Sequence, residues 1–179
     1  THPHANMEII SYVINGEITH EDSMRNEETL KRGELQYLSA GDGIYHSEYN
    51  LNKTRYLRLL QIWIIPPKSS LPRLYGSKRY LKEDRENKLL NIVSSEKGDA
   101  EIKIHQDVNF YVSELEKDKT IEYKIDKDRQ VYFVQIEGTS TINGIELNYG
   151  DAMEITKENE ITISAISNSH FLFIEMKEA

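Results

Sequence analysis

Residues 1–20, which read THPHANMEIISYVINGEITH, decide the fold. Residues 7–14 are rich in β-branched and aromatic side chains and run into Asn15-Gly16, a pair that strongly favours a hairpin turn. Polar and apolar residues then alternate from residue 17 to residue 20. We therefore expect two strands joined by a β-hairpin at Asn15-Gly16.

Short strand patterns separated by turns continue along the rest of the chain. Further strands are expected at residues 35–38, 56–65, 89–93, 102–106, 109–112, 120–125, 130–137, 160–164 and 170–175. Residues 141–147 are expected to form a second hairpin, which turns at Asn143-Gly144. Residues 66–76 indicate a connector with proline and serine, and the charged residues 80–87 a loop or one helical turn. Because many short strands with regular turns are typical of β-sandwiches and barrels, we expect an all-β protein.

Length and composition indicate an ordinary globular protein. The chain has 179 residues, of which 38% are hydrophobic and 29% are charged, and its formal net charge is −8. This negative charge argues against direct binding to nucleic acid. The absence of cysteine excludes disulfides and thiolate metal sites and fits a reducing compartment. No apolar run approaches the length of a membrane span and no signal-peptide pattern opens the chain, so we expect a cytoplasmic protein without a membrane partner.

Two short histidine motifs indicate metal chemistry. His2 and His4 are separated by one residue, as are His46 and Glu48. Residues i and i+2 of a strand share a face, so each pair would project together. If the two strands face one another, three imidazoles and one carboxylate converge on one point. That ligand set suits a divalent transition metal with open coordination positions.

The second half of the chain reads as a diverged repeat of the first. In each half a strand ends in glycine, a hairpin follows, and Gly-Glu or Gly-Asp opens the next strand. The positions of the second half that match His4 and His46 hold Asp126 and Ile163. We therefore expect one metal site per chain, in the first half.

The spacing His-x-His-x3-Glu-x7-Gly, followed by Gly-x12-His-x3-Asn, resembles the two cupin motifs. More narrowly, the chain resembles the pirin family of bicupins over nearly its whole length. The residues that carry this resemblance are Thr1-His2-Pro3-His4, Met7-Glu8-Ile9, Ser39-Ala40-Gly41, His46-Ser47-Glu48-Tyr49-Asn50, Leu60-Gln61-Ile62-Trp63-Ile64, Ile104-His105-Gln106-Asp107, Val134-Gln135-Ile136-Glu137-Gly138, Asn143-Gly144 and Gly150-Asp151.

The resemblance implies an all-β bicupin of two stacked jelly-roll barrels. Residues 1–66 would form the N-terminal cupin with the metal motif, and residues 67–179 a connector and a C-terminal cupin without metal ligands. Pirins carry several strands ahead of the His-x-His motif, and these are absent before Thr1. The resemblance therefore implies an incomplete N-terminal barrel with an exposed sheet edge, which a second copy of the chain would cover in a homodimer.

The resemblance also implies a ligand set, namely His2, His4, His46 and Glu48. Cupins in general use the glutamate of the first motif instead, which is Glu8 here. Alternation along the strands does not choose between the two carboxylates, and the pirin pattern favours Glu48. We expect one divalent transition metal, iron first, although these ligands also admit zinc, manganese, nickel, cobalt or copper.

Some bacterial pirins resemble quercetin dioxygenases, and animal members look like nuclear proteins that bind transcription regulators in an iron-dependent way. We therefore expect a metal-dependent dioxygenase of the quercetin 2,3-dioxygenase type, acting on a small aromatic substrate such as a flavonol. Its catalytic base would be Glu48, with Glu8 as the other candidate. The alternatives are a non-catalytic regulatory or protein-binding module, and a remnant whose metal site stays unoccupied.

The remaining histidines and the tryptophan show no motif of their own. His20, His105 and His170 stand alone in the sequence, and we expect them to be satisfied inside the structure or exposed on it. Trp63 is expected to be a core or strand-face residue.

Overall fold

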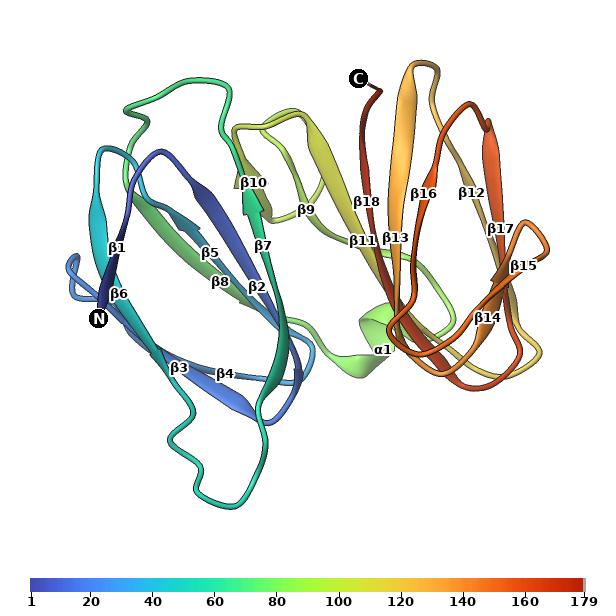
Figure 1. The fold of residues 1–179 in the computed structure, drawn as a ribbon, viewed down its shortest axis with the longest axis horizontal. Coiled ribbons are helices and arrows are strands. Elements are labelled where there is room, and N and C mark those ends of the chain that lie inside the picture. The colour runs from blue at the N-terminus through green and yellow to red at the C-terminus, as the bar shows by residue number, and fades with distance from the viewer. Residues whose placement is uncertain (179) are drawn as a thin grey trace. The chain divides into compact units, whose positions relative to one another are not determined.

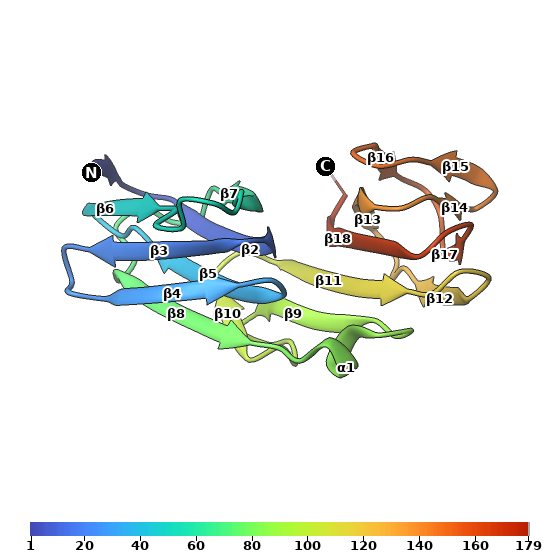
Figure 2. The same ribbon diagram turned by 90° about the horizontal axis from the view of Figure 1, so that it is seen from below.

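The computed structural model describes residues 1–178, which form two compact units (Figures 1 and 2). The first unit comprises Thr1–Tyr80 together with Ile104–Gln106, and the second comprises Leu81–Lys103 and the described chain from Asp107 onward. Each unit is built around a pair of β-sheets. This architecture confirms the prediction of an all-β bicupin.

Within residues 1–80, eight strands form two four-stranded antiparallel sheets. The strands are β1 (His2–His4), β2 (Glu8–Asn15), β3 (Glu17–Asp22), β4 (Glu27–Lys31), β5 (Glu34–Ser39), β6 (Ile44–Tyr49), β7 (Arg58–Ile64) and β8 (Leu74–Arg79). One sheet has the order β1-β6-β3-β4 and the other has the order β7-β2-β5-β8. Both histidine motifs therefore lie on neighbouring strands of one sheet.

The turn at Asn15-Gly16 does not make the expected hairpin. Gly16 has a φ of +74°, and a Cβ at this position would lie 2.4 Å from the carbonyl oxygen of Tyr56, so the turn requires glycine. However, β2 and β3 belong to different sheets. The turn was predicted correctly, but the pairing of the strands on either side of it was wrong, because the turn carries the chain from one sheet to the other.

The second unit contains a six-stranded sheet, β10-β9-β11-β18-β13-β16, and a four-stranded sheet, β12-β17-β14-β15. Its elements are α1 (Lys82–Arg85), β9 (Leu90–Ser95), β10 (Ile102–Ile104), β11 (Val108–Leu115), β12 (Thr120–Lys124), β13 (Arg129–Glu137), β14 (Ser140–Ile142), β15 (Ile145–Leu147), β16 (Ala152–Ile155), β17 (Glu160–Ala165) and β18 (Ser169–Lys177). The single turn of α1 confirms the short helix allowed by the charged residues 80–87. By contrast, β8 begins inside the expected connector.

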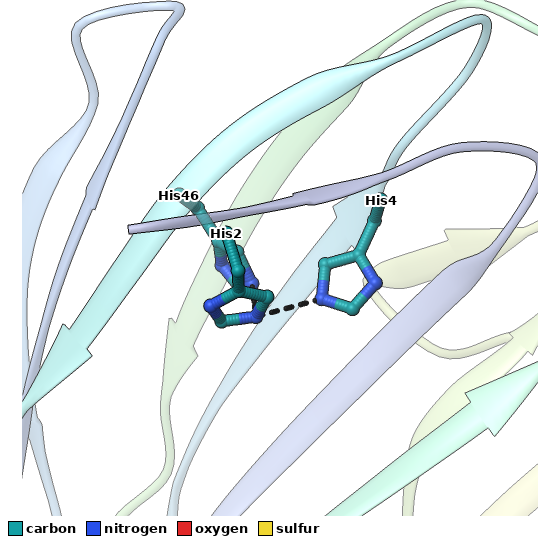
Figure 3. A group of neighbouring side chains, drawn as sticks. All are labelled: His2, His4 and His46. Atoms are coloured by element: carbon teal, nitrogen blue, oxygen red, sulfur yellow. Dashed lines mark hydrogen bonds between the residues drawn. The ribbon is translucent and has the colours of Figure 1, made fainter.

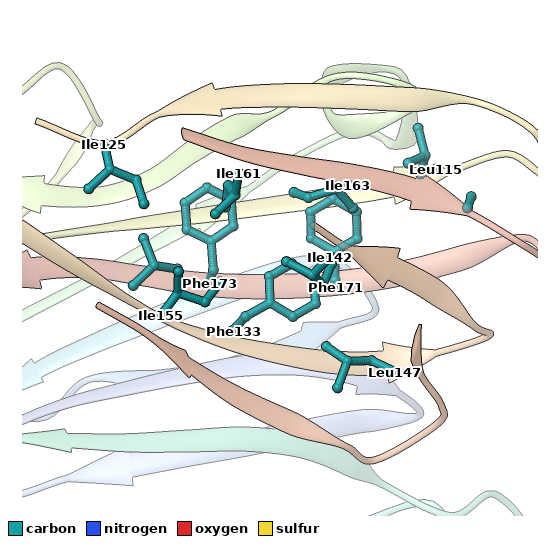
Figure 4. Close-up of a cluster of buried hydrophobic side chains, with 12 residues drawn as sticks. Leu115, Ile125, Phe133, Ile142, Leu147, Ile155, Ile161, Ile163, Phe171 and Phe173 are labelled. Carbon is teal, nitrogen blue, oxygen red and sulfur yellow. The ribbon is translucent and has the colours of Figure 1, made fainter. Parts of the chain in front are cut away.

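An apolar cluster drawn from both sheets fills the second unit (Figure 4). Phe133, Phe171 and Phe173 are fully buried, and the rings of Phe133 and Phe171 stack with their centroids 5.0 Å apart. Ile163, the residue that matches His46 in the repeat, is part of this cluster and is also fully buried. Each such side chain contributes about 1.5–3 kcal/mol on burial, so this interior serves stability.

The first unit has a different interior, in which a polar layer separates two apolar clusters. Along one face of β2 the residues are Ile9, Ser11 and Val13. Ile9 and Val13 belong to two separate buried clusters, whereas Ser11 between them is a fully buried polar residue. The candidate site is built on this polar layer.

None of the helices in residues 1–178 has the length and apolarity needed to cross a membrane.

Candidate metal centre

Three of the predicted ligands meet on the sheet that contains β1 and β6 (Figure 3). His2 pairs directly with His46 in the β1–β6 ladder. The Nε2 atom of His2 lies 2.9 Å from Nε2 of His4 and 3.0 Å from Nε2 of His46. In an octahedron with metal–nitrogen bonds of ~2.1 Å, neighbouring ligand atoms are ~3.0 Å apart. The two spacings from His2 therefore match those of neighbouring ligands on one cation, and all three ligand atoms lie within 4.8 Å of one another.

Glu48 lies two residues after His46 on β6 and belongs to a second group of candidate ligands. In this group the ligand atoms of His20, His46 and Glu48 lie within 4.8 Å of one another. His46 is thus common to both groups. The structure brings His2, His4 and His46 together in one group and places Glu48 beside His46 in the other.

Two glutamine side chains hold the Glu48 carboxylate. Gln36 of β5 donates to Glu48 Oε1 at 2.6 Å, and Gln61 of β7 donates to Oε2 at 2.8 Å. Both glutamines lie opposite Ser11 of β2 in the strand register, and both approach its Oγ. The polar layer therefore fixes the carboxylate with neutral donors, and each carboxylate oxygen keeps further lone-pair capacity.

His20 is a further candidate ligand that neither histidine motif of the sequence includes. It lies directly opposite Glu48 in the β3–β6 ladder, and its side chain is fully buried. Its ring stacks on Tyr75 with a centroid distance of 4.8 Å. His20 is buried with a hydrogen-bond partner, as expected, but pairing between β3 and β6 also brings it to the second motif, which its isolated position in the sequence does not indicate. Its spacing of two residues from Asp22 was the available signal.

Asp22 is the hydrogen-bond partner of His20. Its Oδ2 atom lies 3.1 Å from Nε2 of His20, and both side chains are fully buried. Burial acts to raise the pKa of Asp22, but hydrogen bonds from the side chains of Asn26 and His20 and from the backbone N–H groups of Asn26 and Met24 outweigh it and lower the pKa. Asp22 is therefore an ionised carboxylate behind His20.

Electrostatics keep the central imidazoles neutral. Burial, together with the neighbouring His2, His20 and His4, lowers the pKa of His46 to about 4, against the opposing effect of Asp22. Burial and His2 also lower the pKa of His4, which Glu48 partly offsets. A neutral imidazole offers a ring lone pair to a metal without first losing a proton.

Glu8, the alternative carboxylate, faces elsewhere. Side chains alternate between the two faces of β2, so Glu8 lies on the face opposite to Ile9 and Ser11. Its Oε1 accepts hydrogen bonds from the hydroxyl of Tyr37 and from the backbone N–H of His105, and lies 2.8 Å from His105 Nδ1. Glu8 is in neither ligand group found among residues 1–178.

Trp63 lies at the rim of the histidine cluster and is 57% exposed. Its ring contacts His4 edge to face, with centroids 5.2 Å apart, and its Nε1–H donates to Gln61 Oε1 at 3.1 Å. A hydrogen-bonded chain therefore leads from the exposed indole through Gln61 to the Glu48 carboxylate. This arrangement places an aromatic surface next to the candidate ligands.

Comparisons with known families agree with this architecture. The family described as Pirin matches residues 1–64, and the family described as quercetinase C-terminal cupin domain matches residues 91–176. The chain is 39% identical over 176 residues to the quercetin 2,3-dioxygenase of Escherichia coli (strain K12), which covers 98% of this chain and 75% of that protein. It is 37% identical over 175 residues to the pirin-like protein of Caulobacter vibrioides, with 97% and 75% covered.

Solved structures give the same result. The crystal structure of YhhW from Escherichia coli superposes with a TM-score of 0.92 at 37% identity, covering 99% of this chain and 75% of that one. The structure of the bacterial pirin YhhW in complex with nickel(II) superposes with a TM-score of 0.91 at 36% identity, covering 99% and 76%. From its sequence, its two double-sheet units and these relatives, the chain belongs to the pirin family.

Proposed function

We propose that this chain is a metal-dependent dioxygenase of the quercetin 2,3-dioxygenase type, with one divalent transition metal held by His2, His4, His46 and Glu48. The observation that carries the proposal is the convergence of three imidazole Nε2 atoms, 2.9 and 3.0 Å from one to the next, on a sheet that also presents Glu48. Relatives named quercetin 2,3-dioxygenase and a nickel complex of a bacterial pirin support it.

The donor set fits the proposed metal. His46 and His4 have lowered pKa values and are neutral at pH 7, and the amide donors of Gln36 and Gln61 orient the carboxylate of Glu48. A bound metal would act as a Lewis acid and would orient a substrate oxygen. Iron as the metal and the cytoplasm as the compartment stay predictions of the sequence, as does the homodimer.

The residues around the metal position have distinct tasks in the proposed reaction. The substrate would be a flavonol, whose hydroxyl must lose its proton, and Glu48 would accept that proton on detaching from the metal. Gln36 and Gln61 are neutral, so they can hold Glu48 in place without competing for that proton. Trp63 offers an exposed aromatic face beside His4 on which a flat substrate ring can pack.

Oxygen consumption with quercetin tests the proposal. Protein loaded in turn with iron(II), nickel(II), cobalt(II) or manganese(II) is compared with His46→Ala under the same conditions. We expect at least one loaded form to consume oxygen in the presence of quercetin. The rate of His46→Ala with the same metal should be at least ~100-fold lower. His170→Ala is the matched control, because His170 is a buried histidine beside a carboxylate, Glu137, in the second unit. Metal binding without turnover would contradict the enzyme and favour the regulatory module.

A further inference from the structure

His20 has no task in the proposed reaction, yet it belongs to a second group of side chains that could hold a metal. His20, His46 and Glu48 come from the adjacent strands β3 and β6, and their ligand atoms lie within 4.8 Å of one another. The rings of His20 and His46 have their centroids 5.4 Å apart. Two imidazoles and one carboxylate form a common three-residue set for zinc and related divalent cations.

The hydrogen bond between His20 and Asp22 selects the nitrogen of His20 that can bind a cation. Asp22 Oδ2 lies 3.1 Å from Nε2 of His20 and accepts its hydrogen bond, so Nε2 carries the proton. The lone pair of the neutral ring is then on Nδ1. A carboxylate behind a histidine is the arrangement that orients metal-ligating histidines in proteins and raises their basicity.

Two buried ring nitrogens near this set have no hydrogen-bond partner within the described residues. They are Nδ1 of His20 and Nδ1 of His46. Both side chains are nearly inaccessible, since His20 is 0% and His46 is 1% exposed. Burying an unpaired nitrogen is unfavourable, and a bound cation would satisfy such an atom.

We propose that His20, His46 and Glu48 form an inner binding position for a divalent transition cation, next to the outer position made by His2 and His4. The inference rests on the proposed function in one respect, which is that His46 and Glu48 are ligands of both positions. A single cation occupies one position or the other. The inner position combines two buried histidines with the half-buried Glu48 on the two inner strands of the sheet, whereas His2 is exposed near the chain end. The inner position therefore retains metal when the outer ligands are lost.

Cobalt(II) binding to a double variant, His2→Ala/His4→Ala, tests the inference. The two substituted residues are the exposed and half-buried ligands of the outer position, so the variant keeps the buried His20 and His46 as well as Glu48. We expect equilibrium dialysis to give about one cobalt per chain, bound more weakly than by the unsubstituted protein. The visible absorption of the bound cobalt should differ from that of the aqua ion because nitrogen replaces water as a ligand.

Adding His20→Gln to the double variant should weaken cobalt binding by a further ~10–100-fold, and adding Asp22→Asn should weaken it in the same range. Adding His170→Gln instead should change nothing, because His170 belongs to neither ligand group. Circular dichroism of the metal-free variants checks that each is folded. If the His20 variant does not fold, the cobalt absorption of the double variant alone decides the question.

Two results would overturn the inference. One is a double variant that binds cobalt no more tightly than the triple variant with His20→Gln. The other is a double variant whose cobalt spectrum is that of the aqua ion. Failure of the unsubstituted protein to bind cobalt would instead count against the proposed function, so the two failures are distinguishable.

Discussion

His46 lies opposite His2 on one side of β6 and opposite Asp22 on the other. The middle strand of three thus carries the one imidazole that both ligand groups share. Because β1 and β3 flank β6 in the same sheet, the spacing of the groups is set by backbone hydrogen bonds rather than by loops. A site supported in this way is held in a fixed geometry before any ligand arrives.

The first prediction concerns the shared ligand. His46→Ala should lower the affinity for nickel(II) by more than ~100-fold, because it removes a member of both ligand groups. Isothermal titration calorimetry of the metal-free protein measures the change, with His105→Ala as a control variant from outside both groups. An affinity within about threefold of the unsubstituted protein would show that the metal is held elsewhere.

The second prediction concerns the amide that orients Glu48. Gln61→Leu removes the donor to Glu48 Oε2 and the acceptor for Trp63. Loss of such an orienting bond typically lowers metal affinity by about 10–100-fold, and we expect that range here. Gln135→Leu is the matched control, because Gln135 is a fully buried glutamine of the second unit. Equal affinities for the two variants would mean that Glu48 needs no such support.

Much of the fold could be predicted from local patterns, whereas strand pairing could not. The alternation of residues 120–125 and the hairpin turn at Asn143-Gly144 are local signals, and both β12 and the pairing of β14 with β15 formed as expected. Asn15-Gly16 carries the same signal, but which sheet the next strand joins depends on long-range packing. Residues 74–79 were missed because Gly76 and Ser77 have low strand propensity, although β8 pairs with β5 along its whole length.

The candidate site shows the same division. The i, i+2 rule was sufficient for His2 and His4, because both lie on one short strand. The same rule could not place Glu8 relative to the histidines. Asn6 has a φ of +50°, and the chain passes from one sheet to the other between β1 and β2, so the alternation of side chains does not continue from His4 to Glu8. The only local signal at His20 is its spacing of two residues from Asp22, and that spacing does not encode the contact with Glu48, which depends on the pairing of β3 with β6.

The third prediction concerns the pH dependence of stability without metal. The pKa of His46 is about 4 in the folded protein and 6.5 at its ordinary value. Between these values the unfolded chain binds a proton that the folded protein does not, so the free energy of unfolding is highest above pH 6.5 and falls towards pH 4. The loss amounts to at most about 3 kcal/mol.

Urea denaturation with a chelator at pH 7, 5.5 and 4 measures this loss. In His46→Gln the imidazole is replaced by a side chain that does not titrate, so the decline should be shallower. The lowered pKa of His4 acts in the same direction, so the free energy of unfolding of His46→Gln should still fall with decreasing pH, but less steeply. A decline of equal size in the variant would show that other groups cause it.

The fourth prediction separates stability from the site. Phe173 is fully buried in the second unit and lies against Tyr111, Tyr123 and Phe133, with ring centroids 5.1, 5.0 and 6.3 Å away. Phe173→Ala should lower the free energy of unfolding by about 3–5 kcal/mol, through lost burial and the cavity it leaves. Urea denaturation measures it. Under folding conditions nickel affinity should be unchanged, and a weaker affinity would mean that the second unit supports the site.

The last prediction uses the only tryptophan in the sequence as a reporter. Trp63 contacts His4, so an open-shell ion bound at His2, His4 and His46 lies close enough to quench the indole emission. Titration with nickel(II) should lower the fluorescence until about one equivalent is bound. Zinc(II) has a filled d shell, and it should bind with little quenching, which controls for a change in structure.

The variant His2→Ala/His4→Ala gives this reporter its sharpest use. In this variant His4, the ligand that contacts the indole, is absent, and the cation is held by His20, His46 and Glu48. The quenching of Trp63 per bound nickel should therefore fall. Binding measured by dialysis and quenching measured by fluorescence should then separate in the double variant but coincide in the unsubstituted protein. If quenching stays in proportion to bound nickel in both proteins, the metal lies at the same distance from Trp63 in each, and the two positions are one.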